Sequence, residues 1–257
     1  MLSAKFKQAL REGRAVVGCT VSINSPEIVE ACGLVGFDFA FIDAEHAPFN
    51  ERECQTLVMA ADVVSMASLI RTPDNNPRQI LKLMDIGASG IIVPDVETAE
   101  DASRAVKAVK YVPLGERGLS SVRSARYSLG GSLGDYTAAS NAESVVICMV
   151  ESKRAVENID EILDCELVDG VIIGTTDLSN SFGVAGQRNS PEVNKAVEHV
   201  VSRARAVGKP YGAVVRGDEN PKQYLEQGYT IIIGSGMGFF TKSARGFVRD
   251  FKSFGAK

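Results

Sequence analysis

Residues 37–48, FDFAFIDAEHAP, form an apolar run that stops at two acids and a histidine. The apolar part predicts a strand buried on both faces, because a parallel strand covered by helices reads as a nearly continuous apolar run. Asp43, Glu45 and His46 fall where that strand ends. Since α/β proteins place active sites at the carboxyl ends of parallel strands, we expect these side chains to serve one. An alternative stays open, in which His46 only caps the next helix or bonds to a loop.

Similar apolar runs recur along the chain and alternate with helical patterns. We expect strands at 15–23, 37–42, 67–70, 90–93, 145–150, 171–174, 211–215 and 230–233. Eight strands, each followed by a helix, predict a single α/β domain over residues 1–257, a TIM (β/α)8 barrel. An open doubly wound sheet is the alternative, but the chain carries neither GxGxxG after a strand nor GxxxxGK[ST].

Residues 111–143 interrupt this rhythm with a glycine- and serine-rich stretch that has no sustained period. We expect a long loop or partly helical insertion that forms a lid over the site. Arg117, Arg123 and Arg126 make it a candidate contact for an anionic substrate. The alternative is that these arginines are solvated and bind nothing specific.

Charge and composition exclude several classes of partner. The chain has 28 basic and 32 acidic residues and no basic run with interleaved aromatics, so we expect neither nucleic acid nor a membrane surface as a partner. No apolar run is long enough to span a bilayer, and the N-terminal segment lacks a signal-peptide core, so we expect a cytoplasmic protein. The five cysteines lack CxxC spacing, which favours reduced thiols over disulfides or a zinc site.

The residues just past four of the expected strands would face one cavity at the barrel rim. They are Asp43, Glu45, His46, Arg71, Glu151 and Asp177. Glu151 and Asp177, on neighbouring strands, offer two hard oxygen ligands and leave positions open for water and substrate, the usual pattern for Mg²⁺ or Mn²⁺. The alternative is that each carboxylate only pairs with an arginine or caps a loop.

Arg71 and His46 complete a set of groups suited to an enolate. Arg71 presents fixed donors to an oxyanion, and His46 can move a proton near neutral pH. No lysine lies on an expected strand, which disfavours a Schiff-base route to the same carbanion.

Five motifs occur together over nearly the whole chain. They are DAEHAP at 43–48, RTP at 71–73, LxxMDIGASGIIVP at 81–94, VESxxAVEN at 150–158 and VDGVIIGTTDLS at 168–179. This set resembles the HpcH/HpaI family of class II, metal-dependent pyruvate aldolases. The resemblance implies a divalent metal ion (Mg²⁺, Mn²⁺ or Co²⁺) and reversible cleavage of a 4-hydroxy-2-oxo acid to pyruvate and an aldehyde. It also implies a homo-oligomer, commonly a hexamer, in which the last helix is exchanged between subunits.

The resemblance assigns the pyruvate half of the site. Glu151 and Asp177 match the family's metal ligands, and the metal chelates the carboxylate and keto oxygen of pyruvate. Backbone amides of the loop Gly174, Thr175 and Thr176 match those that hold the pyruvate carboxylate.

The catalytic groups follow from the same match. Arg71 matches the arginine that contacts the keto or enolate oxygen, and His46 matches the catalytic base. Asp85 matches the acid that pairs with this base, and Asp43 matches a residue near the aldehyde half.

The chain departs from the family pattern at four places: Met149, Thr175, the Leu-Ser-Ser stretch at 119–121, and Met237-Gly238. These departures leave the matched metal ligands and the catalytic base intact. They bear on which aldehyde is the partner and on the catalytic efficiency. Two alternatives therefore stay open. One is an acyl-CoA lyase of the citrate lyase β-subunit type, and the other is a non-catalytic barrel that binds metal and ligand.

Overall fold

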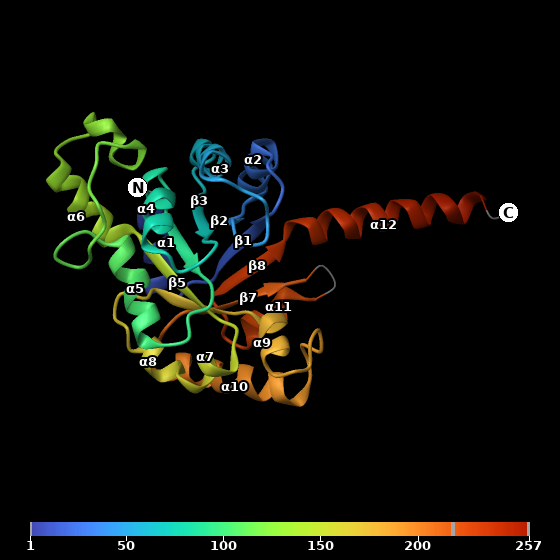
Figure 1. Cartoon of the computed structure of the whole chain (residues 1–257). Helices are drawn as coiled ribbons and strands as arrows, with labels where there is room; N and C mark the ends of the chain where they lie inside the picture. The colour runs from blue at the N-terminus through green and yellow to red at the C-terminus, as the bar shows by residue number, and fades with distance from the viewer. Residues whose placement is uncertain (1, 217–218, 256–257) are drawn as a thin grey trace.

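The computed structural model describes residues 2–216 and 219–255 and shows a closed barrel of parallel strands (Figure 1). The strands are β1 (Val16–Val21), β2 (Phe39–Asp43), β3 (Ala67–Arg71), β4 (Gly90–Val93), β5 (Val145–Val150), β6 (Gly170–Ile173), β7 (Tyr211–Val215) and β8 (Ile231–Ser235). Each strand pairs with the next, and β1 pairs with β8. The predicted barrel is confirmed. An open sheet is excluded, because its first and last strands would lack a partner, whereas β1 and β8 pair with each other.

Helices surround the barrel and connect its strands. They are α1 (Leu2–Arg11), α2 (Pro26–Val35), α3 (Glu51–Val63), α4 (Pro77–Asp85), α5 (Ala99–Val109), the 3₁₀ helix η1 (Arg123–Ser128), α6 (Leu133–Glu143), α7 (Lys153–Glu157), α8 (Ile159–Leu163), α9 (Thr175–Ser181), α10 (Pro191–Ala206), α11 (Pro221–Glu226) and α12 (Gly236–Gly255). Residues just before a helix determine where it begins, as α3 illustrates. Asn50 accepts hydrogen bonds from the amides of Arg52 and Glu53 and completes a capping box for α3.

Two apolar clusters hold the barrel together. The larger cluster lies between the strands and the outer helices, and the smaller one fills the barrel interior. Phe6, on α1, packs edge-to-face on Phe39 with ring centroids 5.0 Å apart, so α1 closes the amino-terminal end of the barrel. The carboxyl ends of the strands are therefore the end left for a site.

The insertion at 111–143 lies at the amino-terminal end of the barrel. It follows α5 and precedes β5, and its helix α6 packs beside α1 (Figure 1). The expected lid is therefore not found over the rim of its own chain. The physical reason is topological, because a segment that joins the end of a helix to the start of the next strand emerges at the amino ends of the strands.

Two buried lysines fasten this end of the barrel. Lys7 donates to the carbonyl oxygen of Ser144 at 2.8 Å and lies 3.0 Å from a carboxylate oxygen of Asp169. Lys110 donates to the same carbonyl oxygen at 2.7 Å and to the Ser144 hydroxyl at 2.8 Å. Burial, together with the charge of Lys7, lowers the pKa of Lys110 to about 7.

The last helix, α12, projects away from the barrel (Figure 1). Phe240, Phe247, Phe251 and Phe254 are all exposed along it. Among the described residues, no helix has the length and apolar character needed to cross a membrane.

We predict that Lys7→Met lowers the free energy of unfolding by about 3 kcal/mol, because it leaves the poorly exposed Asp169 carboxylate without its cation. Lys5→Met is the matched control, since Lys5 is exposed on the same helix. Urea unfolding followed by circular dichroism measures both. Equal stabilities of the two variants would contradict the role given to Lys7.

Candidate active site

Arg71 is locked into the rim by two acids. Its Nε donates to Oδ1 of Asp43 at 3.0 Å and its Nη2 donates to Oδ2 at 2.7 Å, while its Nη1 lies 2.9 Å from Oε2 of Glu45. Register explains the pair, because Asp43 and Arg71 lie directly opposite each other on β2 and β3. Burial alone raises the pKa of Asp43, but the Arg71 guanidinium outweighs it and holds that pKa below its usual value. The guanidinium is thus both charged and fixed.

The apolar departure at Met149 touches this arginine. Nη1 of Arg71 lies 3.8 Å from the Met149 sulfur, inside the barrel mouth. A thioether is a weak acceptor, so this face of the guanidinium stays available to a stronger one.

Glu151 is a buried carboxylate directly after β5. Its Oε1 accepts a hydrogen bond from the amide of Asp95 at 2.9 Å, and no described residue donates to Oε2. Burial raises its pKa to about 7, and the nearby charges of Glu45 and Asp177 act in the same direction. A Cβ atom at position 174 would lie 2.6 Å from Oε2, so glycine there leaves the oxygen accessible.

Asp177 stands in the first turn of α9, the helix that follows β6, and it lines the cavity at the barrel mouth together with Arg71 and Met149. No group of three or more His, Cys, Asp or Glu side chains gathers for a metal within residues 2–216 and 219–255. Two carboxylates that follow adjacent strands, one of them with an oxygen that accepts no hydrogen bond from a described residue, still fit a hard cation, since Mg²⁺ is often held by one or two carboxylates plus water and substrate. The donor set therefore fits the implied metal.

His46 lies at the mouth of the cavity, where its side chain is 62% exposed and 4.0 Å from Oε2 of Glu45. Its backbone amide donates to Oδ1 of Asp43 at 3.2 Å, which fixes the loop but leaves the imidazole free. The helix-cap alternative is wrong, because Asn50 caps α3. The imidazole makes no hydrogen bond to the described part of the chain.

Asp85 does not lie at this rim of the barrel. It ends α4, at the amino-terminal end of the barrel, and binds Nη2 of Arg117 at 2.7 Å. The structure therefore brings together Asp43, His46, Arg71, Glu151 and Asp177 but not Asp85. Its pairing with His46 stays a prediction.

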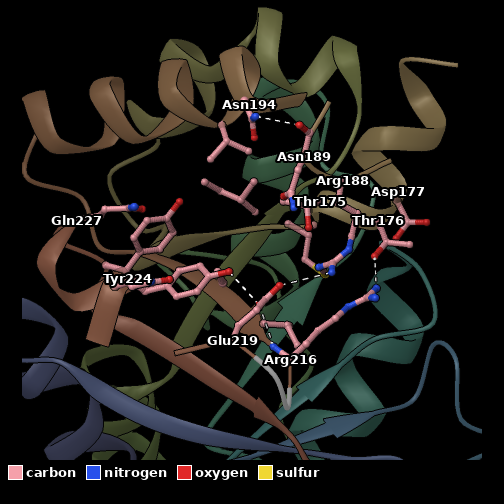
Figure 2. Close-up of a pocket in the computed structure, with 18 of the residues that line it drawn as sticks. Thr175, Thr176, Asp177, Arg188, Asn189, Asn194, Arg216, Glu219, Tyr224 and Gln227 are labelled. Carbon is pink, nitrogen blue, oxygen red and sulfur yellow. Dashed lines mark hydrogen bonds and ion pairs between the residues drawn. The ribbon is translucent and has the colours of Figure 1, made fainter. Parts of the chain in front are cut away.

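The cavity has a volume of about 570 Å³ and reaches from His46 and Arg71 past the loop at 174–177 to α10 and α11. Figure 2 shows Thr175 and Thr176 on its wall together with Arg188 and Arg216.

Arg188 and Arg216 were not expected from the sequence. Arg216 directly follows β7, so the signal that identified Arg71, a polar residue just past an apolar strand, could have found it. Arg188 lies in an irregular segment between α9 and α10 and carries no such signal.

Comparison with known proteins agrees with this geometry. A sequence model of the HpcH/HpaI aldolase/citrate lyase family matches residues 17–245. A 5-keto-4-deoxy-D-glucarate aldolase of Citrobacter koseri is 37% identical over 249 residues, which cover 96% of each chain.

Two solved structures are also similar. A HpcH/HpaI aldolase/citrate lyase family protein from Burkholderia cenocepacia J2315 has a TM-score of 0.92 and 28% identity, over 97% of this chain and 99% of that one. A HpcH/HpaI aldolase from Desulfitobacterium hafniense DCB-2 has a TM-score of 0.88 and 30% identity, over 96% of each chain. The chain therefore belongs to the HpcH/HpaI aldolase/citrate lyase family.

Proposed function

We propose that the protein is a divalent-metal-dependent aldolase that reversibly cleaves a 4-hydroxy-2-oxo acid to pyruvate and an aldehyde. One observation carries this proposal: the buried carboxylate of Glu151, directly after β5, and the carboxylate of Asp177, in the helix after the adjacent strand β6, lie at the same rim as a guanidinium fixed by two acids. A cation and a fixed donor at one rim are what an enolate oxygen needs. The named aldolases among its relatives support the same reaction class.

Glu151 and Asp177 would hold the metal, which is Mg²⁺, Mn²⁺ or Co²⁺. When bound, the metal supplies a Lewis acid for the oxygens of the 2-oxo acid. The two protein ligands use oxygen atoms only, which suits these hard ions better than a soft thiolate site would.

Arg71 and the loop at 174–176 orient the 2-oxo acid. Asp43 and Glu45 fix the Arg71 guanidinium before substrate arrives, so its donors need no reorganisation when charge develops on the enolate oxygen. We place the carboxylate of the 2-oxo acid against the backbone amides of residues 174–176, at the start of α9.

His46 would transfer the proton in the cleavage step. Its imidazole lines the cavity and is free of hydrogen bonds to the described part of the chain, so it can accept the proton of the C4 hydroxyl as the C3–C4 bond breaks and return a proton to C3 of the enolate to give pyruvate. Asp43 supports this loop through the amides of Glu45 and His46 and lies toward the aldehyde half.

We further propose a homo-oligomer in which α12 packs on a neighbouring subunit. The exposed phenylalanines of α12 support this, since a stripe of four large apolar side chains is unusual on a free surface. In the same assembly, Asp85 and the insertion would meet the rim of a neighbour, because they share the far end of their own barrel.

The proposed reaction predicts metal-dependent exchange of the pyruvate methyl protons in D₂O, measured by NMR. His46→Ala should slow it by about 10²- to 10⁴-fold, the usual contribution of a general base. His199→Ala is the matched control, because the other histidine is exposed on α10. Absence of exchange with Mg²⁺, Mn²⁺ and Co²⁺ in the unmodified protein would overturn the proposed function.

Glu151→Gln should stabilise the metal-free protein at pH 8 by up to about 3 kcal/mol, the equivalent of raising a pKa from 4.5 to about 7. The sign follows from the raised pKa: this group contributes a loss of stability as pH rises from about 4.5 to about 7, and Gln removes that loss. The variant should also lose the thermal stabilisation that Mn²⁺ gives the unmodified protein. A variant that keeps this stabilisation would exclude Glu151 as a ligand.

If Asp85 acts on a neighbour's rim, His46→Ala and Asp85→Asn should complement each other. Each pure variant should be nearly inactive, whereas co-expressed subunits should regain exchange activity at about a quarter of their sites by random assortment. Co-expression of His46→Ala with Arg71→Lys is the control, because both changes lie on the rim of one subunit. Equal activity of the two mixtures would contradict a shared site.

A further inference from the structure

Three arginines line the active-site cavity, and two of them are neutralised by acids. Arg71 is bound by Asp43 and Glu45. Arg188 lies 3.5 Å from a carboxylate oxygen of Glu219. The third, Arg216, has no carboxylate within ion-pair distance among the described residues. Its Nη2 lies 3.5 Å from the hydroxyl of Thr176, toward which it points (Figure 2).

The backbone of Arg216 is held while its side chain stays uncommitted. The amide of Arg216 donates to Oε2 of Glu219 at 3.0 Å, and the Tyr224 hydroxyl donates to the same oxygen at 3.1 Å. These bonds fix the start of the loop after β7. The guanidinium thereby extends over the cavity beside Thr176, the neighbour of Asp177.

Arg216 also belongs to a second hollow. A groove between the rim and α12 is lined by Arg216, Lys242, Arg245 and Arg249. The three α12 cations lie three and four residues apart and so share one face of the helix. The cavity and the groove meet at Arg216, so its guanidinium contributes positive charge to both.

We propose that Arg216 binds a carboxylate on the aldehyde half of the substrate, so that the site selects an aldehyde with a negative charge of its own. This inference rests on the proposed aldolase function. A guanidinium with no carboxylate partner among the described residues matches a substrate carboxylate in charge and in bidentate geometry. In the proposed function the carboxylate of the 2-oxo acid would have its partners on the loop after β6 and on the metal, whereas Arg216 directly follows the next strand, β7.

The test compares aldehydes that differ in charge. Pyruvate addition is measured with glyoxylate against glycolaldehyde and with succinate semialdehyde against butyraldehyde. The unmodified protein should favour the anionic member of at least one pair. Arg216→Gln should lower kcat/KM for that anion by about 10- to 100-fold, as expected for a lost hydrogen bond to a charged group, and change the neutral member by less than about threefold.

Two variants and one separate assay make the outcomes distinct. Arg216→Lys should recover part of the anion preference. Arg14→Gln, which removes an exposed arginine outside the cavity, should leave kcat/KM unchanged for both aldehydes. A higher KM for pyruvate in proton exchange, with the aldehyde preference unchanged, would overturn the inference by placing Arg216 on the 2-oxo acid. Equal losses for both aldehydes would overturn it by showing a structural role. Proton exchange without any charge preference overturns this inference alone, whereas no exchange overturns the proposed function.

Discussion

The pairing of β1 with β8 is the constraint on which the site depends, because it turns eight separate strand ends into a ring. In that ring, side chains at the strand ends contact groups on or just after the neighbouring strand. Asp43 meets Arg71 because their backbones are paired directly across β2 and β3. Glu151 meets position 174 because β5 and β6 are adjacent, and glycine at that position leaves room for the carboxylate. The chemistry is therefore a consequence of closure and register.

Some charged side chains at the rim are paired within the protein and others are not. This difference distinguishes the residues that support the site from those that bind metal or substrate. Asp43 and Arg71 satisfy each other, so they form a rigid pair whose free edge is available to substrate. Glu151 is buried with one backbone donor and three acidic neighbours, Glu45, Asp95 and Asp177, and it forms no ion pair with a described residue. Arg216 lacks an anion among the described residues. Groups that are left short of a counter-charge are the ones that a metal and a substrate can complete.

Much of this could be predicted from the sequence, because apolar runs that end in polar residues mark both the strands and the rim. Strand ends at Asp43, Arg71 and Val150 agree with the expected positions to within about one residue. The position of residues 111–143 could not be predicted from composition, since glycine and serine indicate a loop but not the end of the barrel at which it emerges. The role of Asp85 is open for a related reason, because a motif match does not say whether an acid at the amino-terminal end of its own barrel acts at the rim of a neighbouring subunit.

The fastening of α1 has a consequence for the order in which the protein forms. Lys7 is made before its partners Ser144 and Asp169, which follow 137 and 162 residues later. The helix that closes the amino-terminal end of the barrel must therefore remain undocked, with Phe6 and Leu10 unburied, until Ser144 and Asp169 have left the ribosome. During synthesis this apolar face is open to chaperones and to other nascent chains, and long-range closure of this kind is slow compared with local helix formation.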